Sequence, residues 1–275
     1  MFVTHEEFMM RHPPMIIIAL VFAFFAHESI GQETALPESA KLTRNTNGNV
    51  TAVRIAGQSN HERLAVKPEA IKALSNFQNL ESLSLWGTTV TDNDIRQLAG
   101  LSNLRLIDLT FTDVTGESLR TLSSLTELVS VRLEGCDVKD EHLAPLADMP
   151  QLAMLYLGRS KVTDAGLKHL RGLKNLNLLQ LSDCAITDAG LASLGDLPRI
   201  QHLWLSKTVR HGDEDLSNLT DKCVDYLTSL DTLIDLRIAD SRLTERGLER
   251  LRDGLPNANV STERTGITYL NRNKQ

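Results

Sequence analysis

From residue 80 onward, apolar and polar residues repeat in a pattern with a period of 24 positions. Apolar residues at positions 4 and 6 of each unit, such as Leu155 and Leu157, are two apart, which predicts a short strand with one buried face. Those at positions 16, 19 and 22, such as Leu167, Leu170 and Leu173, are three apart, which predicts a helix with one buried stripe. Each unit is therefore predicted to form a strand, a turn and a helix.

The units share the frame LxxLxLxx(T/C/S)x(V/I)TDxGLxxLxxL, in which the Thr-Asp pair is typical of a helix N-cap and first turn. Repeats in register at a fixed period predict a solenoid, in which each unit buries its apolar face against its neighbours. The last unit follows a longer one that carries an insertion at residues 209–218. The predicted repeats start at Val50, Leu80, Leu104, Leu128, Leu152, Leu176, Ile200 and Leu233.

This pattern resembles the leucine-rich-repeat family over about residues 50–260, in the TDxGL variety similar to repeats of secreted bacterial proteins and of F-box adaptors. Position 9 holds Thr, Ser or Cys where Asn is usual, which is similar to the cysteine-containing subtype. The resemblance implies an α/β solenoid of about eight repeats, with a curved parallel β-sheet on the concave face and short helices on the convex face.

The resemblance also implies that position 9 lies inside the turn, where Cys136 and Cys184 are expected to be buried and structural rather than catalytic. The two cysteines are two repeats apart, or about 10 Å at the usual strand spacing, which is too far for a disulfide. With Cys223 the chain has three cysteines, an odd number that excludes a complete disulfide framework.

Residues 1–31 have the features of a secretory signal peptide. Twelve apolar residues at 15–26 follow Arg11, and Ser29 and Gly31 are small residues suited to cleavage after Gly31. A membrane anchor is the alternative, although spanning a bilayer takes about 20 residues. Because acidic Glu6 and Glu7 are unusual in such a segment, translation starting at Met9 or Met10 instead of Met1 remains open. We expect a linker and capping hairpin at 32–49, repeats at 50–261, a tail at 262–275, and a secreted or periplasmic protein without membrane attachment after cleavage.

Composition and charge exclude some classes of function. Aromatic residues make up only 4% of the chain, which indicates an aliphatic core. The net charge of −6, or about −4 after loss of the three acidic and one basic residues in 1–31, and the absence of Lys/Arg runs argue against nucleic-acid binding. Common catalytic motifs are absent, so we expect no catalysis and no cofactor.

Positions 3, 5, 7 and 8 of each unit are predicted to face outward on the concave side, and both tryptophans of the chain fall on them. Large aromatics and arginines on such a surface are typical of binding hot spots, whereas the alternative is that they are isolated exposed side chains. We expect the hot spot in the C-terminal half of the face, beside the insertion, with a second cluster towards the N-terminus. The candidates are Tyr156, Arg159, Asp183, Trp204 and Lys207, then Trp86, Phe111 and Arg132.

The sequence therefore predicts an extracytoplasmic module that binds a protein or peptide ligand on its concave face. An F-box-like adaptor is the first alternative, but no helical segment typical of an F-box precedes residue 50. A metal-dependent hydrolase centred on His211, Asp213 and Asp215 is the second. The acidic stretch in the insertion lacks the spacing and glycine of a calcium-binding EF-hand, which favours a solvated loop without a metal ion.

Overall fold

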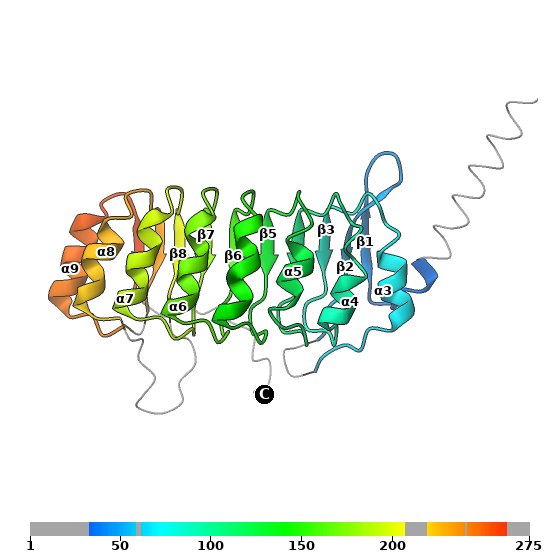
Figure 1. The fold of residues 1–275 in the computed structure, drawn as a ribbon, viewed down its shortest axis with the longest axis horizontal. Helices are drawn as coiled ribbons and strands as arrows, with labels where there is room; N and C mark the ends of the chain where they lie inside the picture. The colour runs from blue at the N-terminus through cyan, green and yellow to red at the C-terminus, as the bar shows by residue number, and fades with distance from the viewer. Residues whose placement is uncertain (1–32, 59–61, 207–218, 240, 263–275) are drawn as a thin grey trace, which may run out of the picture.

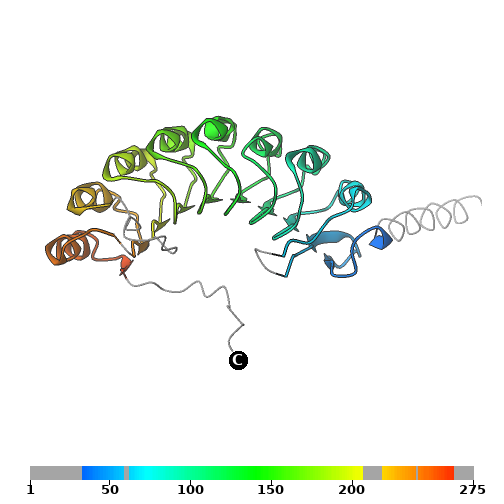
Figure 2. The same cartoon turned by 90° about the horizontal axis from the view of Figure 1, so that it is seen from below.

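The computed structural model describes residues 33–58, 62–206, 219–239 and 241–262, which form a row of stacked strand–helix units (Figure 1) that is curved into an arc (Figure 2). Seen along the helix axes, the strands line the inner side of the arc and the helices its outer side (Figure 2). The predicted α/β solenoid, with a parallel sheet on the concave face and short helices on the convex face, is confirmed.

One ten-stranded sheet runs through the described residues in chain order. The first two strands form an antiparallel hairpin at the N-terminal end, and all later neighbours are parallel. The strands are β1 (Lys41–Arg44), β2 (Val50–Arg54), β3 (Ser82–Ser84), β4 (Leu106–Asp108), β5 (Ser130–Arg132), β6 (Met154–Tyr156), β7 (Leu178–Gln180), β8 (His202–Trp204), β9 (Asp235–Arg237) and β10 (Asn259–Ser261).

The helices on the outer side are short; α6 and α7 continue as the 3-10 helices η2 and η3, whereas the 3-10 helix η4 precedes α8. They are α3 (Pro68–Leu74), α4 (Asp92–Arg96), α5 (Ser118–Leu122), η1 (Asp140–Asp148), α6 (Asp164–Leu167), η2 (Lys168–Gly172), α7 (Asp188–Leu191), η3 (Ala192–Asp196), η4 (Asp221–Cys223), α8 (Val224–Thr228) and α9 (Glu245–Gly254).

The core is a continuous column of aliphatic side chains between the sheet and the helices. Leu155 pairs with Leu179 across β6 and β7, and neither is exposed. The same holds for the helix positions Leu167 and Leu170, so both predicted periodicities are confirmed. Because strands pair at an offset of one repeat, equivalent residues stack, and each side chain packs against its counterparts in the neighbouring units.

The TDxGL motif connects consecutive repeats at the N-termini of the helices. The carboxylate of Asp164 accepts hydrogen bonds from the backbone N–H of Thr187 (2.8 Å) and from its hydroxyl (2.5 Å). Thr187 in turn caps α7 by accepting from the N–H of Ala189. A Cβ atom at Gly190 would overlap the Asp164 carboxylate, which explains the glycine of the motif. The same bonds join Asp92 to Thr115, Asp140 to Thr163, Asp188 to Thr220 and Asp221 to Thr244.

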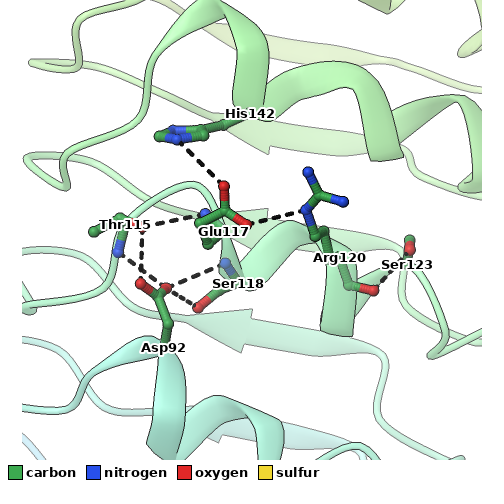
Figure 3. Close-up of polar contacts among 7 residues, drawn as sticks. All are labelled: Asp92, Thr115, Glu117, Ser118, Arg120, Ser123 and His142. Carbon is green, nitrogen blue, oxygen red and sulfur yellow. Dashed lines mark hydrogen bonds and ion pairs between the residues drawn. The ribbon is translucent and has the colours of Figure 1, made fainter.

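The series is interrupted once, where Gly116 stands in place of the aspartate. There His142 and Glu117 lie close to each other (Figure 3). The imidazole of His142 occupies the space that a Cβ atom at Gly116 would need. His142 Nδ1 accepts from the backbone N–H of Lys139 at 3.1 Å, and its Nε2 lies 3.8 Å from a carboxylate oxygen of Glu117. A histidine therefore links these two repeats instead of an aspartate.

Position 9 lies inside the turn, as the resemblance implied. The hydroxyl of Thr112 donates to the carbonyl of Leu109 at 2.7 Å, and the Cys136 thiol in the next repeat contacts the same carbonyl at 3.1 Å. Cys136, Cys184 and Cys223 are buried and form no disulfide. Burial raises the pKa of the Cys136 thiol and raises that of Cys223 to about 12, so these thiols remain protonated and unreactive.

Candidate functional site

The concave face is made by the side chains that point away from the core on strands β2 to β9. In the N-terminal half these side chains are small at Ser82 and Ser84 on β3 and at Ser130 on β5, with Leu106 and Asp108 on β4 between them. In the C-terminal half they are large, with Tyr156 on β6 and Trp204 on β8. The difference in side-chain volume makes the N-terminal half hollow and fills the C-terminal half.

The hollow in the N-terminal half has a volume of about 520 Å³. It extends over four strands, from β2 to β5, and reaches Met154 on β6. Leu106 projects into it with 40% of its surface exposed, an unusual exposure for a leucine on a strand. The polar and aromatic side chains of its lining are Arg54, Ser82, Ser84, Trp86, Asp108, Ser130 and Arg132.

The charged groups of the hollow differ in how they are paired. Asp108 accepts a hydrogen bond from the backbone N–H of Thr110 at 3.0 Å and one from the Ser84 hydroxyl at 3.4 Å. Arg132 lies over the Tyr156 ring, with its guanidinium carbon 4.3 Å from the ring centroid. Among the described residues, the Arg54 side chain has no hydrogen bond or ion pair. The hollow therefore offers cations whose charge is available to a ligand.

Tyr156 was expected to project into solvent, and this expectation is wrong. Only 6% of its surface is exposed, because Arg132 covers its ring and Trp204 packs against it edge-on at a centroid distance of 6.0 Å. Its neighbour Gln180 is 2% exposed. On a tightly curved inner face, adjacent large side chains converge and bury one another. The position of one residue in its repeat predicts that it points outward, but not that its neighbours cover it.

Trp204 is half-buried and its polar group is satisfied within the chain. Its indole N–H donates to Asp235 at 2.8 Å, and the Arg237 guanidinium carbon lies 4.1 Å from the indole centroid. Asp235 also pairs with Arg237 at 3.2 Å and lies 3.8 Å from His202. These side chains form a closed network at the C-terminal end of the described concave face.

A row of left-handed residues borders the concave face at position 8 of the repeats. Gly87 and Gly135 have φ angles of 64° and 69°, as glycine readily allows. Phe111, Arg159 and Asp183 hold the same conformation with φ of 55°, 58° and 60°. A side chain costs about 1 kcal/mol or more in this region, and such residues concentrate at functional sites.

These three side chains contact one another along the border. The Arg159 guanidinium carbon lies 5.7 Å from the Phe111 ring centroid, and its Nε lies 3.7 Å from a carboxylate oxygen of Asp183. A Cβ atom at Gly135 would overlap the Phe111 ring. Phe111 and Arg159 therefore form a fixed rim beside the face.

Glu134 is the one carboxyl group of the described concave face whose pKa is clearly raised. It is raised from 4.5 to about 6, mainly by burial and also by the charge of Asp108, while Arg132 and Arg159 oppose the shift. Gln180 donates to Glu134 at 3.1 Å and accepts from the backbone N–H of Gly158 at 2.6 Å. Glu134 therefore links the two halves of the face and titrates near neutral pH.

The structure brings the predicted residues together in two groups. Trp86 and Arg132 line the hollow, whereas Tyr156, Arg159, Asp183 and Trp204 belong to the filled half or its border. Lys207, the insertion at 209–218 and the hydrolase candidates His211, Asp213 and Asp215 lie outside the described residues. Leu106 and Arg54 were predicted to face outward but not to form the site. The small residues Ser82 and Ser84 on β3 and Ser130 on β5 are the signal that points to them.

Within the described residues, no group of three or more His, Cys, Asp or Glu side chains is arranged to hold a metal ion. None of the helices in that part of the chain has the length and apolar character that a bilayer crossing requires.

No protein-family model matches the sequence, and none of the curated proteins is significantly similar to it. The ectodomain of the Arabidopsis receptor kinase HAESA, solved with an N-terminally extended IDA peptide hormone, matches with a TM-score of 0.54 at 16% identity, over 80% of this chain and 35% of that one. HAESA in complex with IDA and the co-receptor SERK1 matches with a TM-score of 0.55 at the same identity and coverage. Internalin C2 from Listeria monocytogenes matches at 19% identity and a TM-score of 0.46, over 77% of this chain and 81% of that one.

The fold of this chain is that of a leucine-rich-repeat solenoid. At these identities the likeness concerns the fold alone. The chain spans about a third of the length of the HAESA chains that it matches, 35% in both structures.

Proposed function

We propose that this chain is an extracytoplasmic binding module that holds a protein or peptide ligand on the concave face of its solenoid and carries out no chemistry itself. The observation that carries the proposal is the hollow of about 520 Å³ in the N-terminal half of that face. The HAESA structures, in which a similar fold is solved with a peptide hormone, support the choice of ligand class.

The side chains of the hollow are those that binding sites use. Trp and Arg dominate interface hot spots, and an exposed aliphatic side chain gains free energy when a partner covers it. Trp86 and Arg132 flank the hollow, and Leu106 projects from its floor. In the C-terminal half, Trp204 and Arg237 already satisfy each other and Asp235, so a ligand gains less by contacting them.

Partner capture with matched variants tests this site. The mature chain and its Leu106→Asp, Trp86→Ala and Trp204→Ala variants are immobilised and exposed to proteins from the native source. We expect a partner that the unmodified chain and Trp204→Ala both retain, and that Leu106→Asp and Trp86→Ala bind at least about tenfold more weakly. A partner retained by Leu106→Asp but lost by Trp204→Ala would move the site to the C-terminal half.

The extracytoplasmic location is part of the proposal and rests on residues 1–31, which lie outside the described residues. We propose cleavage after Gly31, which leaves a linker and capping segment to residue 49, repeats at 50–261 and a tail at 262–275. N-terminal sequencing of exported material should begin at Gln32. Exported protein that still contains residues 15–26 would contradict cleavage, and a purely cytosolic protein would favour the adaptor alternative.

We also propose that the repeats are of the cysteine-containing type. Cys136 and Cys184 support this assignment, because each thiol contacts a backbone carbonyl of the preceding repeat, Leu109 for the first and Leu157 for the second. A Cys184→Ser variant keeps a donor at this position and should fold with nearly unchanged stability. Marked destabilisation would show that the hydrogen bond to Leu157 is not what this position requires.

A further inference from the structure

We infer that the ligand of the hollow is an acidic peptide segment, bound extended across strands β1 to β5 with acidic side chains at both ends and an apolar side chain between them. This inference rests on the proposed function and adds the chemical class of the ligand and its orientation across the strands.

The first observation is a pair of cations for which the described residues supply no partner. Lys41 on β1 and Arg54 on β2 are directly opposite each other in the antiparallel hairpin, so both side chains are on the concave side. Both are exposed, and among the described residues neither side chain makes a hydrogen bond or ion pair. Like charges directly opposite destabilise a strand pair, so an anionic ligand placed between them would relieve this repulsion.

The second observation is a further cation at the other end of the hollow. Arg132 is on β5, three strand spacings from Arg54, which corresponds to about 14 Å. Its described contacts are with the ring and the hydroxyl of Tyr156, a neutral side chain, and its charge also lowers the pKa of the nearby Glu134 carboxyl against the effect of burial. Arg132 is exposed and therefore able to pair with a second anionic group.

The surface between the cations is apolar at its centre. Leu106 on β4 and the ring of Trp86 lie between the strands of Arg54 and Arg132. An extended chain covers about 14 Å in about four residues, and side chains two apart point the same way. Acidic residues four apart would therefore reach the two cationic ends, and the residue midway would cover Leu106.

Asp108 discriminates between a peptide and a uniform polyanion. It lies between the cations with its oxygens turned to Thr110 and Ser84, and a carboxylate retains further acceptor capacity. The backbone N–H groups of a peptide are donors suited to that acceptor. A sulfated polysaccharide or a nucleic acid would instead bring its negative groups against the Asp108 carboxylate.

A displayed library with five randomised positions in a Gly/Ser frame tests the inference on the mature chain. We expect enrichment of Asp or Glu at the first and fifth positions, with Leu, Ile, Met or Phe at the third. The Lys41→Gln/Arg54→Gln variant should lose the preference at one end only, because Arg132 is intact. Arg96→Gln, which removes an exposed arginine from helix α4, is the control of equal charge type and should select the same sequences.

Synthetic peptides then give affinities by fluorescence anisotropy. Replacing both acidic residues of a Glu-Ser-Leu-Ser-Glu peptide with Gln should weaken binding at least about tenfold, and so should Lys41→Gln/Arg54→Gln. Shortening the spacing between the acids to two residues should have a comparable effect. Binding should also weaken between low and moderate salt, as expected for exposed charges.

The remaining outcomes contradict the inference. Enrichment of neutral or basic sequences that depends on Leu106 would overturn the acidic ligand while leaving the proposed function standing. If a heparin-derived oligosaccharide bound through Arg54 and acidic peptides did not bind, the ligand would be a polyanion and not a peptide. No enrichment at all would also overturn the inference, whereas the proposed function is judged separately by partner capture.

Discussion

The two halves of the concave face carry the same kinds of residue in opposite states. In the C-terminal half, Trp204, Asp235 and Arg237 satisfy one another and leave little for a ligand. In the N-terminal half, Arg54 has no described partner and Leu106 is exposed above a hollow. Residue type alone therefore does not identify a binding site. The volume of the neighbouring side chains decides whether an aromatic ring or a cation is available to a ligand.

The largest difference in stability should separate the two halves. Tyr156→Ala removes an almost fully buried ring and should lower the free energy of unfolding by about 3 kcal/mol. Trp86→Ala removes a ring that is only half-buried and should cost about 1 kcal/mol. Denaturant melts of both variants measure this difference. Equal losses would mean that Tyr156 is no more buried than Trp86 in solution.

Glu134, where the halves meet, should make stability depend on pH. Because its pKa in the folded chain is raised to about 6, the folded state holds the proton more tightly than the unfolded chain, whose value is about 4.5. This stabilisation is complete below about pH 4.5 and is lost as the pH rises through about 6.

Glu134→Gln should therefore remove the dependence and stabilise the chain at pH 7 by up to about 2 kcal/mol. Melts of both proteins between pH 4 and pH 8 provide the measurement. If the difference in unfolding free energy between the variant and the unmodified chain stayed constant across this range, Glu134 would have an ordinary pKa.

The aspartates of the two halves should also differ. Asp235 accepts from Trp204 and Arg237, so Asp235→Ala leaves an indole N–H and a guanidinium without their acceptor and should cost about 1 to 2 kcal/mol. Asp108 accepts from Ser84 and the Thr110 N–H at the edge of an open hollow, so Asp108→Ala should cost less than about 1 kcal/mol. The reverse order would contradict the closed network at the C-terminal end.

The smallest effect on stability should come from filling the hollow. Ser84→Tyr places a ring among Arg54, Trp86 and Leu106, as Tyr156 does in the other half. Unfolding should change by no more than about 0.5 kcal/mol, because this is a surface substitution, while partner binding falls at least about tenfold. Ser123→Tyr on the convex side is the control for an added surface ring. Unchanged partner binding by Ser84→Tyr would exclude the hollow.

The repeat pattern was sufficient to predict the fold, because a period of 24 residues with apolar positions two and three apart specifies both elements of the unit. It also located Trp86 and Arg132 on the concave face. The repeat pattern did not predict contacts between side chains on different strands of the curved sheet. The position of Tyr156 in its repeat does not reveal that Arg132 and Trp204 cover its ring. The pattern did not place Lys41 on the concave face, because this residue precedes the first repeat.

The TDxGL motif shows the same limit. Its Thr-Asp pair predicts a helix cap, and Thr187 does cap α7. The second role of the aspartate, as acceptor for the threonine of the next repeat, depends on stacking between units and becomes visible only in three dimensions.

The chain contains two tryptophans, Trp86 in the hollow and Trp204 in the closed network, so fluorescence can report each half separately. The decisive measurement is the emission of the Trp204→Phe and Trp86→Phe variants during titration with a partner captured by the unmodified chain. A change in emission from Trp86 in the first variant, with constant emission from Trp204 in the second, is the predicted result. A change confined to Trp204 would place the ligand on the C-terminal half and contradict the account.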